Sequence, residues 1–208
     1  MPPAQTFTHL LMTDWSTVDQ HMRTWASRIT DDLAIDVADA VHLATTISRE
    51  VAAVGDTTRD AMRAVSPVAV ERRIEELRAF QTWMDIAHAR PHPAVVRAQV
   101  LTQNYICFVY LKETWFDVLK THMPAGCVTA KCCDFLLANP VRRFRNGFAH
   151  GNWSYLPDFS GLEFWARDKG FGHAERRTVL AQLDLSFWQA LSRCTAYASM
   201  QTLIEGAA

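Results

Sequence analysis

Apolar residues recur along most of the chain at intervals of three and four, the spacing of side chains on one face of an α-helix. Glycine and proline divide this pattern into long segments, and no internal repeat is visible. The clearest segment opens at Pro67, a residue favoured in the first turn of a helix. Four of its apolar residues share one stripe: Ile74, Leu77, Phe80 and Met84. The pattern therefore predicts an all-α, or mainly α, protein.

Signals for helix starts and stops set the expected order of the helices. An N-terminal hairpin is expected, with a first helix over residues 14–29 and a second that starts at Thr30 and ends before Gly55. Asp31 and Asp32 favour that start because acidic side chains stabilise the positive end of a helix dipole. Further helices are expected over residues 67–90, 94–123, 129–138 and 184–203.

One stretch, residues 153–167, departs from helical spacing. It contains turn signals at Pro157 and Gly161. After Gly161 the side chains alternate between apolar and more polar types, as they do in a short strand. We therefore predict a small β-hairpin here, which residues 176–180 could extend.

Length and composition favour a single domain. With 208 residues, of which 49% are hydrophobic, the chain can bury a core without disulfides or a structural metal. We expect one domain over residues 1–208, in which residues 14–65 add N-terminal helices to a core formed by residues 66–206. The longest apolar run, residues 105–111, is too short to span a bilayer, so we expect no membrane partner.

Charge and cysteine content indicate which partners and which cellular compartment to expect. The formal net charge is −1, so there is no overall positive field, and a nucleic acid would need a local basic patch. The first residues lack the basic start and apolar centre of a secretion signal. The five cysteines are an odd number, which favours reduced thiols. We therefore expect a cytoplasmic protein.

The segment over residues 140–153 concentrates the candidate chemistry. On a helical wheel its apolar face carries Val141, Phe144 and Phe148. Its polar face carries Arg142, Asn146 and His150, spaced four apart, together with Arg143. Fixed positive charge, an amide and an imidazole can hold a phosphate and move a proton beside it. Arg145 lies between the two faces.

The run Arg145-Asn146-Gly147-Phe148-Ala149-His150 resembles the defining motif of the HEPN superfamily, in which an Arg and a polar residue precede a His four to six positions after the Arg. The Asn form is associated with the ribonucleases of that superfamily. The wider run RNGFAHGNW resembles small single-domain bacterial HEPN proteins, over about residues 68–204. The resemblance implies a HEPN-type helical bundle.

The resemblance also implies an activity, metal-independent cleavage of RNA without any cofactor. His150 would act as acid or base, Arg145 would contact the phosphate, and Asn146 would orient either the His or the substrate. The products would be a 2′,3′-cyclic phosphate, or its opened form, and a 5′-hydroxyl. Arg142 and Arg143 would bind the RNA backbone, although solvated surface charge explains them equally well. A toxin or defence role, with a separate antitoxin protein, is the matching expectation.

Helix geometry raises a difficulty, because residues five apart point about 140° from each other. Arg145 and His150 therefore do not automatically face one pocket. HEPN proteins commonly bring two copies of the motif into one cleft, so we expect a homodimer.

Other interpretations stay open. A HEPN module can bind RNA or nucleotide, or scaffold a protein complex, without catalysis. The motif can also be a coincidence in a helical protein that binds another protein. We expect no metal, because the cluster of His122, Cys127, Cys132 and Cys133 contains no CxxC pair. A second Arg-to-His run, residues 167–173, contains two glycines and is expected in a loop.

Overall fold

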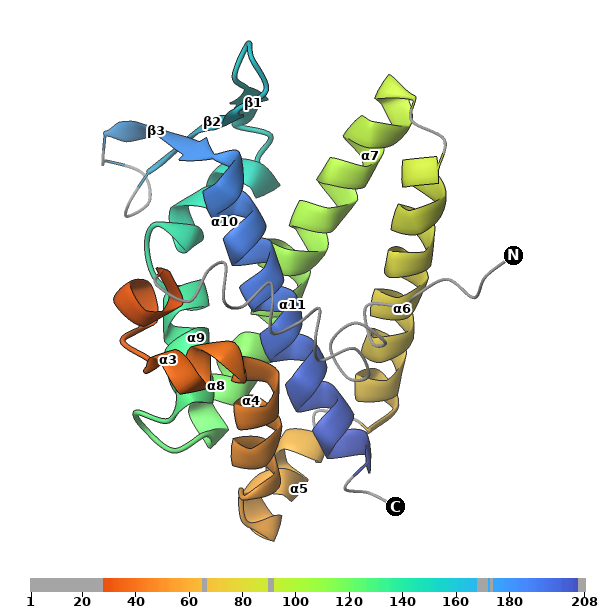
Figure 1. Ribbon diagram of the computed structural model, residues 1–208, viewed down its shortest axis with the longest axis vertical. Helices are drawn as coiled ribbons and strands as arrows, with labels where there is room; N and C mark the ends of the chain where they lie inside the picture. Colours follow the sequence, from red (N-terminus) through yellow and green to blue (C-terminus); the bar gives the residue numbers. More distant parts are fainter. Residues whose placement is uncertain (1–27, 65–66, 90–91, 168–171, 173, 206–208) are drawn as a thin grey trace.

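The computed structural model describes residues 28–64, 67–89, 92–167, 172 and 174–205. It is mainly helical, as predicted, with the C-terminal helix α11 running through the middle of the molecule (Figure 1). The labelled helices that precede it are α3 (Val37–Val41), α4 (Leu43–Ala52), α5 (Asp56–Ala64), α6 (Pro67–Ala89), α7 (Pro93–Asn104), α8 (Asp117–His122), α9 (Val128–Leu137) and α10 (Val141–Ala149). Helix α11 (Gln182–Glu205) packs against α4, α6 and α9 and against the sheet.

The predicted N-terminal hairpin needs correction. Residues 28–33 are helical, but Ala34 has a φ of 52°, which interrupts the helix predicted from Thr30. The chain re-enters a helix at α3, where the Asp36 carboxylate accepts a hydrogen bond from the Asp39 N–H at 2.9 Å. The predicted end before Gly55 is confirmed, whereas α5 was not predicted. Most of the first predicted helix, residues 14–27, lies outside the described residues.

The predicted helix over residues 94–123 is one helical rod that contains wide π-turns. Between α7 and α8 it includes η1 (Tyr105–Tyr110) and η2 (Lys112–Phe116), while the backbone keeps helical dihedral angles at the junctions. The rod carries Trp115 into the interior, where its side chain is fully buried. Its indole Nε1 donates a hydrogen bond to Oγ of Ser199 on α11 at 2.8 Å. This polar end of a large apolar side chain is thus satisfied.

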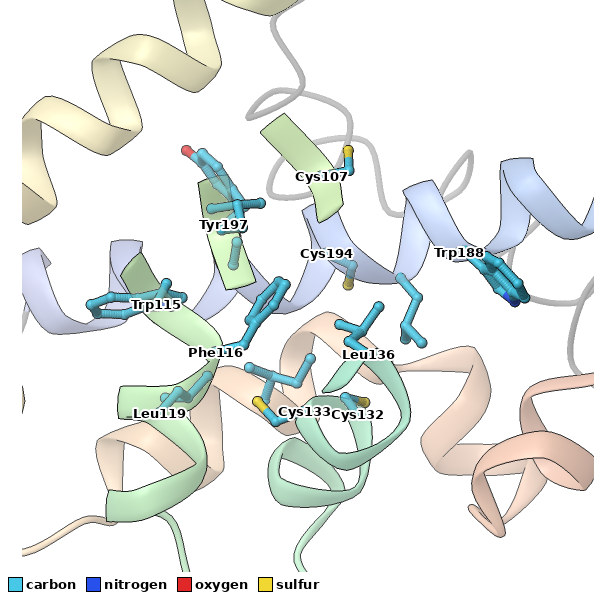
Figure 2. Packing of buried hydrophobic residues seen from close by; sticks show 14 of the residues in the cluster. Cys107, Trp115, Phe116, Leu119, Cys132, Cys133, Leu136, Trp188, Cys194 and Tyr197 are labelled. Carbon is cyan, nitrogen blue, oxygen red and sulfur yellow. The ribbon is translucent and has the colours of Figure 1, made fainter. Parts of the chain in front are cut away.

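Thiols and large apolar side chains share the central core. Figure 2 shows the labelled side chains from the rod, α9 and α11: Cys107, Trp115, Phe116, Leu119, Cys132, Cys133, Leu136, Trp188, Cys194 and Tyr197. Four of the five cysteines are buried, and the fifth, Cys127, is partly buried. Desolvation raises the pKa of Cys107 to about 11 and that of Cys194 to about 12. These two thiols therefore stay protonated at neutral pH.

The predicted hairpin is confirmed, and residues 176–180 do extend it. The described part of the chain forms a three-stranded antiparallel sheet in the order β1 (Trp153–Tyr155), β2 (Gly161–Arg167) and β3 (Glu175–Ala181). The central strand β2 buries Leu162, Phe164 and Ala166. Strand β2 lies against α10, so the sheet supports the helix that carries the candidate motif. No helix within the described residues is long and apolar enough to cross a bilayer.

Candidate active site on helix α10

Helix α10 is held by its apolar face, as its sequence pattern predicts. Val141, Phe144 and Phe148 are all buried. The Phe144 ring meets the Phe164 ring of β2 edge to face, with centroids 5.3 Å apart. Full burial of one such side chain contributes about 1.5–3 kcal/mol, so this face fixes the helix firmly. The polar residues of the motif therefore stand on a rigid support.

The close contact between α10 and the sheet depends on Gly147. A Cβ atom at this position would lie 3.2 Å from the Trp165 carbonyl oxygen and 3.3 Å from that of Asn152. These distances are tighter than ordinary van der Waals contacts. The absence of a side chain at Gly147 thus lets the backbone of the sheet approach α10 closely.

The end of α10 is a Schellman turn centred on Gly151. This glycine has a φ of 71°, and its N–H bonds the Phe148 carbonyl at 3.1 Å. The N–H of Asn152 bonds the Gly147 carbonyl at 2.8 Å, the second hydrogen bond of that motif. His150 is consequently the C-cap of α10, with φ −94° and ψ 5°, and does not occupy a regular helical position. This corrects the helical wheel, in which His150 continued the polar face.

Arg145 and Asn146 are directly joined. The Arg145 guanidinium donates to the amide oxygen of Asn146 from Nε at 3.1 Å and from Nη2 at 2.7 Å. Its Nη1 donates to Oε1 of Glu113 at 2.8 Å. The Arg145 side chain is only 16% exposed. The arginine fork is therefore held in one orientation at the edge of the helix.

Glu113 belongs to a small charged network that sequence analysis missed. It lies on η2 and forms ion pairs with Arg145 at 2.8 Å and with Lys112 at 3.0 Å. The Lys112 ammonium also reaches Asp117 at 3.0 Å. Glu113 is 56% exposed, so solvent screens these pairs and each contributes modestly. No local motif could have identified Glu113, because it precedes Arg145 by 32 residues.

His150 is exposed to solvent at the end of α10. Its backbone N–H donates to the Asn146 carbonyl at 3.2 Å. Among the described residues, its side chain makes no hydrogen bond or ion pair, and none joins it to Arg145. The structure thus brings Arg145 and Asn146 together and leaves His150 available at the negative end of the helix dipole.

The two remaining arginines of α10 differ in exposure. Arg142 is exposed to solvent. Arg143 is half-buried, with its Nε and Nη1 atoms shielded from solvent. Arg142 therefore offers the more accessible positive charge for a phosphate.

A groove opens beside the end of α10. It has a volume of about 930 Å³ and lies between α7 and the segment that begins at Gly151 and includes β1. Its lining is formed by His92, Pro93, Arg97, Val100, Leu101, Gly151, Trp153, Ser154, Tyr155 and Phe159. The sheet and the first turns of α7 stand at the same end of the molecule (Figure 1). Because Gly151 follows His150 directly, the groove adjoins the motif.

Two of the residues first weighed as metal ligands, His122 and Cys127, have hydrogen-bond partners at helix ends, and Cys132 and Cys133 are buried in the core. His122 Nδ1 lies 2.8 Å from the Val118 carbonyl oxygen, one turn earlier on α8. Cys127 Sγ accepts a hydrogen bond from Ala130 N–H at 3.4 Å, at the start of α9. Within the described ranges, no three His, Cys, Asp or Glu side chains gather as metal ligands would. The second Arg-to-His run connects β2 with β3, and most of it lies outside the described residues.

Comparison with known proteins gives no further guide to function beyond the motif at residues 145–150. Scans against models of protein families, against curated proteins and against solved structures found no match to this chain. The resemblance to HEPN proteins accordingly rests on residues 145–150 and on their helical setting.

Proposed function

We propose that this protein is a metal-independent endoribonuclease of the HEPN type, with Arg145 and His150 as its catalytic residues and Asn146 as the residue that positions Arg145. The observation that carries the proposal is the arrangement of the motif. An arginine fork fixed by the neighbouring amide and an accessible imidazole stand on one rigid helix end. The exposed Arg142 supplies further positive charge on the same helix, and Arg143 adds to it.

The chemistry needs no external nucleophile, because RNA carries a 2′-hydroxyl next to each phosphate. His150 removes the proton of that hydroxyl, and the 2′-oxygen attacks phosphorus. The bond from phosphorus to the 5′-oxygen breaks, and this oxygen takes up a proton to leave as a 5′-hydroxyl. Arg145 stabilises the negative charge that develops on the phosphoryl oxygens. The other product is a 2′,3′-cyclic phosphate.

A homodimer completes this site in the proposal. The His150 side chain makes no hydrogen bond to Arg145 within the chain, so one motif alone does not assemble the acid, the base and the phosphate ligand. A second copy of α10 across a two-fold axis would add another Arg145 and His150 to the same cleft. Sedimentation or light scattering should therefore show a dimer.

The biological setting follows from the resemblance alone. We propose a toxin or defence role in the cytoplasm, with an antitoxin protein that restrains cleavage.

A second candidate is a HEPN module that binds RNA or nucleotide, or scaffolds a protein complex, without cleavage. The ion pair between Arg145 and Glu113 favours it, because the carboxylate occupies the nitrogen that a phosphate would otherwise contact.

Cleavage of RNA in the presence of EDTA separates the two functions. The enzyme should cut single-stranded RNA in EDTA, and His150→Ala and Arg145→Ala should each abolish cutting. Arg49→Ala is the matched control, because Arg49 is 70% exposed on α4 and lies outside the motif. Binding of RNA by the folded wild-type dimer without any cleavage would support the second candidate. Equal cleavage by wild type and His150→Ala would refute the enzyme.

A further inference from the structure

Aromatic side chains dominate one wall of the groove beside α10. Three of them follow the motif closely in sequence: Trp153, Tyr155 and Phe159. The Trp153 ring stacks on Phe148 of α10 with centroids 5.2 Å apart. Tyr155 meets Trp153 at 5.4 Å, and Phe159 meets Tyr155 at 5.5 Å. The wall is therefore a continuous series of rings anchored on the motif helix.

The last ring of this series is presented to solvent. Phe159 is 71% exposed, although its side chain is large and apolar. Its φ of 58° lies in the left-handed region, which costs a non-glycine residue about 1–2 kcal/mol. The loop holds it there, since its N–H bonds the Leu156 carbonyl at 2.9 Å and Asp158 accepts two hydrogen bonds from Ser160. A strained backbone that displays an aromatic ring at a groove suggests a ligand.

The opposite wall, formed by α7, carries one cation, Arg97, among the apolar side chains of Pro93, Val100 and Leu101. Arg97 is exposed and lines the same groove as Tyr155, and its positive charge partly offsets the rise that burial causes in the pKa of Tyr155. His92 Nδ1 accepts the Ala94 N–H at 3.2 Å, which leaves Nε2 as a donor in the neutral imidazole. None of the described residues that line the groove is acidic. The lining thus matches a ligand that is flat, aromatic and anionic.

We propose that this groove binds one nucleobase and its adjacent phosphate, as a base-binding subsite of the RNA substrate next to His150. The base stacks on the aromatic series at its exposed ring, Phe159, and the phosphate pairs with Arg97. The volume of about 930 Å³ falls within the range of about 300–1,000 Å³ of small-molecule sites. As a subsite, the assignment rests on the proposed ribonuclease function, because only then does the bound nucleotide adjoin the scissile phosphate.

A binding assay that needs no catalysis tests the subsite. The probe is a fluorescent single-stranded RNA of four nucleotides with 2′-O-methyl groups, which cannot be cut by attack of its own 2′-oxygen. Phe159→Ala and Arg97→Gln should each weaken binding at least fivefold. Leu183→Ala and Arg49→Gln are matched controls, since both residues are exposed and lie outside the groove, and these two variants should bind like wild type.

The salt dependence of RNA binding distinguishes the contribution of Arg97 from that of the aromatic wall. Arg97→Gln should lower the slope of log affinity against log salt by about 1, because one phosphate contact is lost. Phe159→Ala should leave that slope unchanged, because stacking releases no counterions.

Two further outcomes separate the subsite from the nuclease. If wild type cleaves RNA while Phe159→Ala and Arg97→Gln bind the probe like wild type, the subsite is refuted and the nuclease stands. If wild type binds the probe through Phe159 and Arg97 but cleaves no RNA, the groove is a nucleotide site and the nuclease is refuted. A Phe159→Ala protein that loses its dimer while it keeps its RNA affinity would assign the groove to a second copy of the chain and overturn the subsite.

Discussion

The Arg145 guanidinium donates two hydrogen bonds to a single oxygen of its neighbour, Oδ1 of Asn146, at 3.1 and 2.7 Å. Adjacent residues on a helix point about 100° apart, so the long arginine side chain bends back across the helix surface to make this contact. The amide therefore fixes the direction of the fork, and Nη1 points to Glu113. In the proposed mechanism Asn146 acts through Arg145, by orienting it toward the phosphate.

Removal of the Asn146 amide should release the Arg145 guanidinium from its fixed orientation. We expect Asn146→Ala to lower kcat on the order of 10²-fold, because a misplacement of about 1 Å in a reacting group can cost that much. The fold should persist, since Asn146 is only partly buried. Steady-state cleavage kinetics measure kcat, and circular dichroism checks the fold. Asn146→Asp keeps the acceptor oxygen but adds a negative charge beside the phosphate, so KM should rise. Unchanged kcat in Asn146→Ala would remove the orienting role.

The Glu113 carboxylate should compete with RNA for Arg145. Glu113→Gln removes an exposed ion pair worth about 0.2–1 kcal/mol, so RNA should bind about 1.4- to fivefold more tightly. Asp117→Asn is the matched control, because it removes an acid that pairs with the same Lys112 but does not touch Arg145. Fluorescence anisotropy at low salt measures the affinities. Equal gains in both variants would mean that only net charge matters.

The left-handed conformation of Gly151 should make this position sensitive to a Cβ atom. Gly151→Ala should lower the free energy of unfolding by about 1–2 kcal/mol, the cost of a left-handed non-glycine residue. No heavy atom lies within 4 Å of the added Cβ, so steric collision contributes little. Asn tolerates this conformation better, and Gly151→Asn should lose less. Urea denaturation ranks the three proteins, and an equal loss for Ala and Asn would count against the Schellman turn.

The buried thiols should make stability fall in alkaline solution. The unfolded chain loses thiol protons near the ordinary pKa of 9.0, whereas the folded chain keeps them, since the pKa of Cys107 rises to about 11 and that of Cys194 to about 12. Rising pH therefore favours the unfolded state above about pH 9, by about 1.4 kcal/mol per pH unit for each fully buried thiol. Below that pH the contribution of the thiols to stability is fully present.

Urea denaturation at pH 8 and pH 10 checks this expectation. Wild type should lose stability between the two values, and Cys194→Ala should lose less over the same interval, because one thiol no longer titrates. An identical decrease in both proteins would show that Cys194 is ionised in the folded state or accessible to solvent.

Local sequence patterns correctly predicted the two elements that support the candidate site, α10 and β2. The spacing of Val141, Phe144 and Phe148 identified the buried face of α10, and the alternation after Gly161 identified β2. Both patterns are local, because each element buries one face regardless of what lies opposite. The position of His150 was also encoded locally: Gly151 directly after it is a common helix-ending signal, which the helical wheel ignored.

Other features depend on long-range packing and have no local signal. Glu113 reaches Arg145 only because the π-turns of the central rod and α10 pack together. Ala34 adopts a positive φ that its residue type disfavours, so the break before α3 could not be predicted. The groove joins Arg97 of α7 to Phe159 of the loop after β1, two segments that sequence analysis placed in separate elements.

The identity of the attacking oxygen tests the central claim most directly. Purified wild-type protein should be incubated in EDTA with one RNA sequence in two forms, unmodified and fully 2′-O-methylated. The account predicts that only the unmodified RNA is cut, with 2′,3′-cyclic phosphate and 5′-hydroxyl ends detected by mass spectrometry, and that His150→Ala leaves both RNAs intact. Cleavage of the methylated RNA, or intact RNA of both forms with folded wild-type protein, would contradict it.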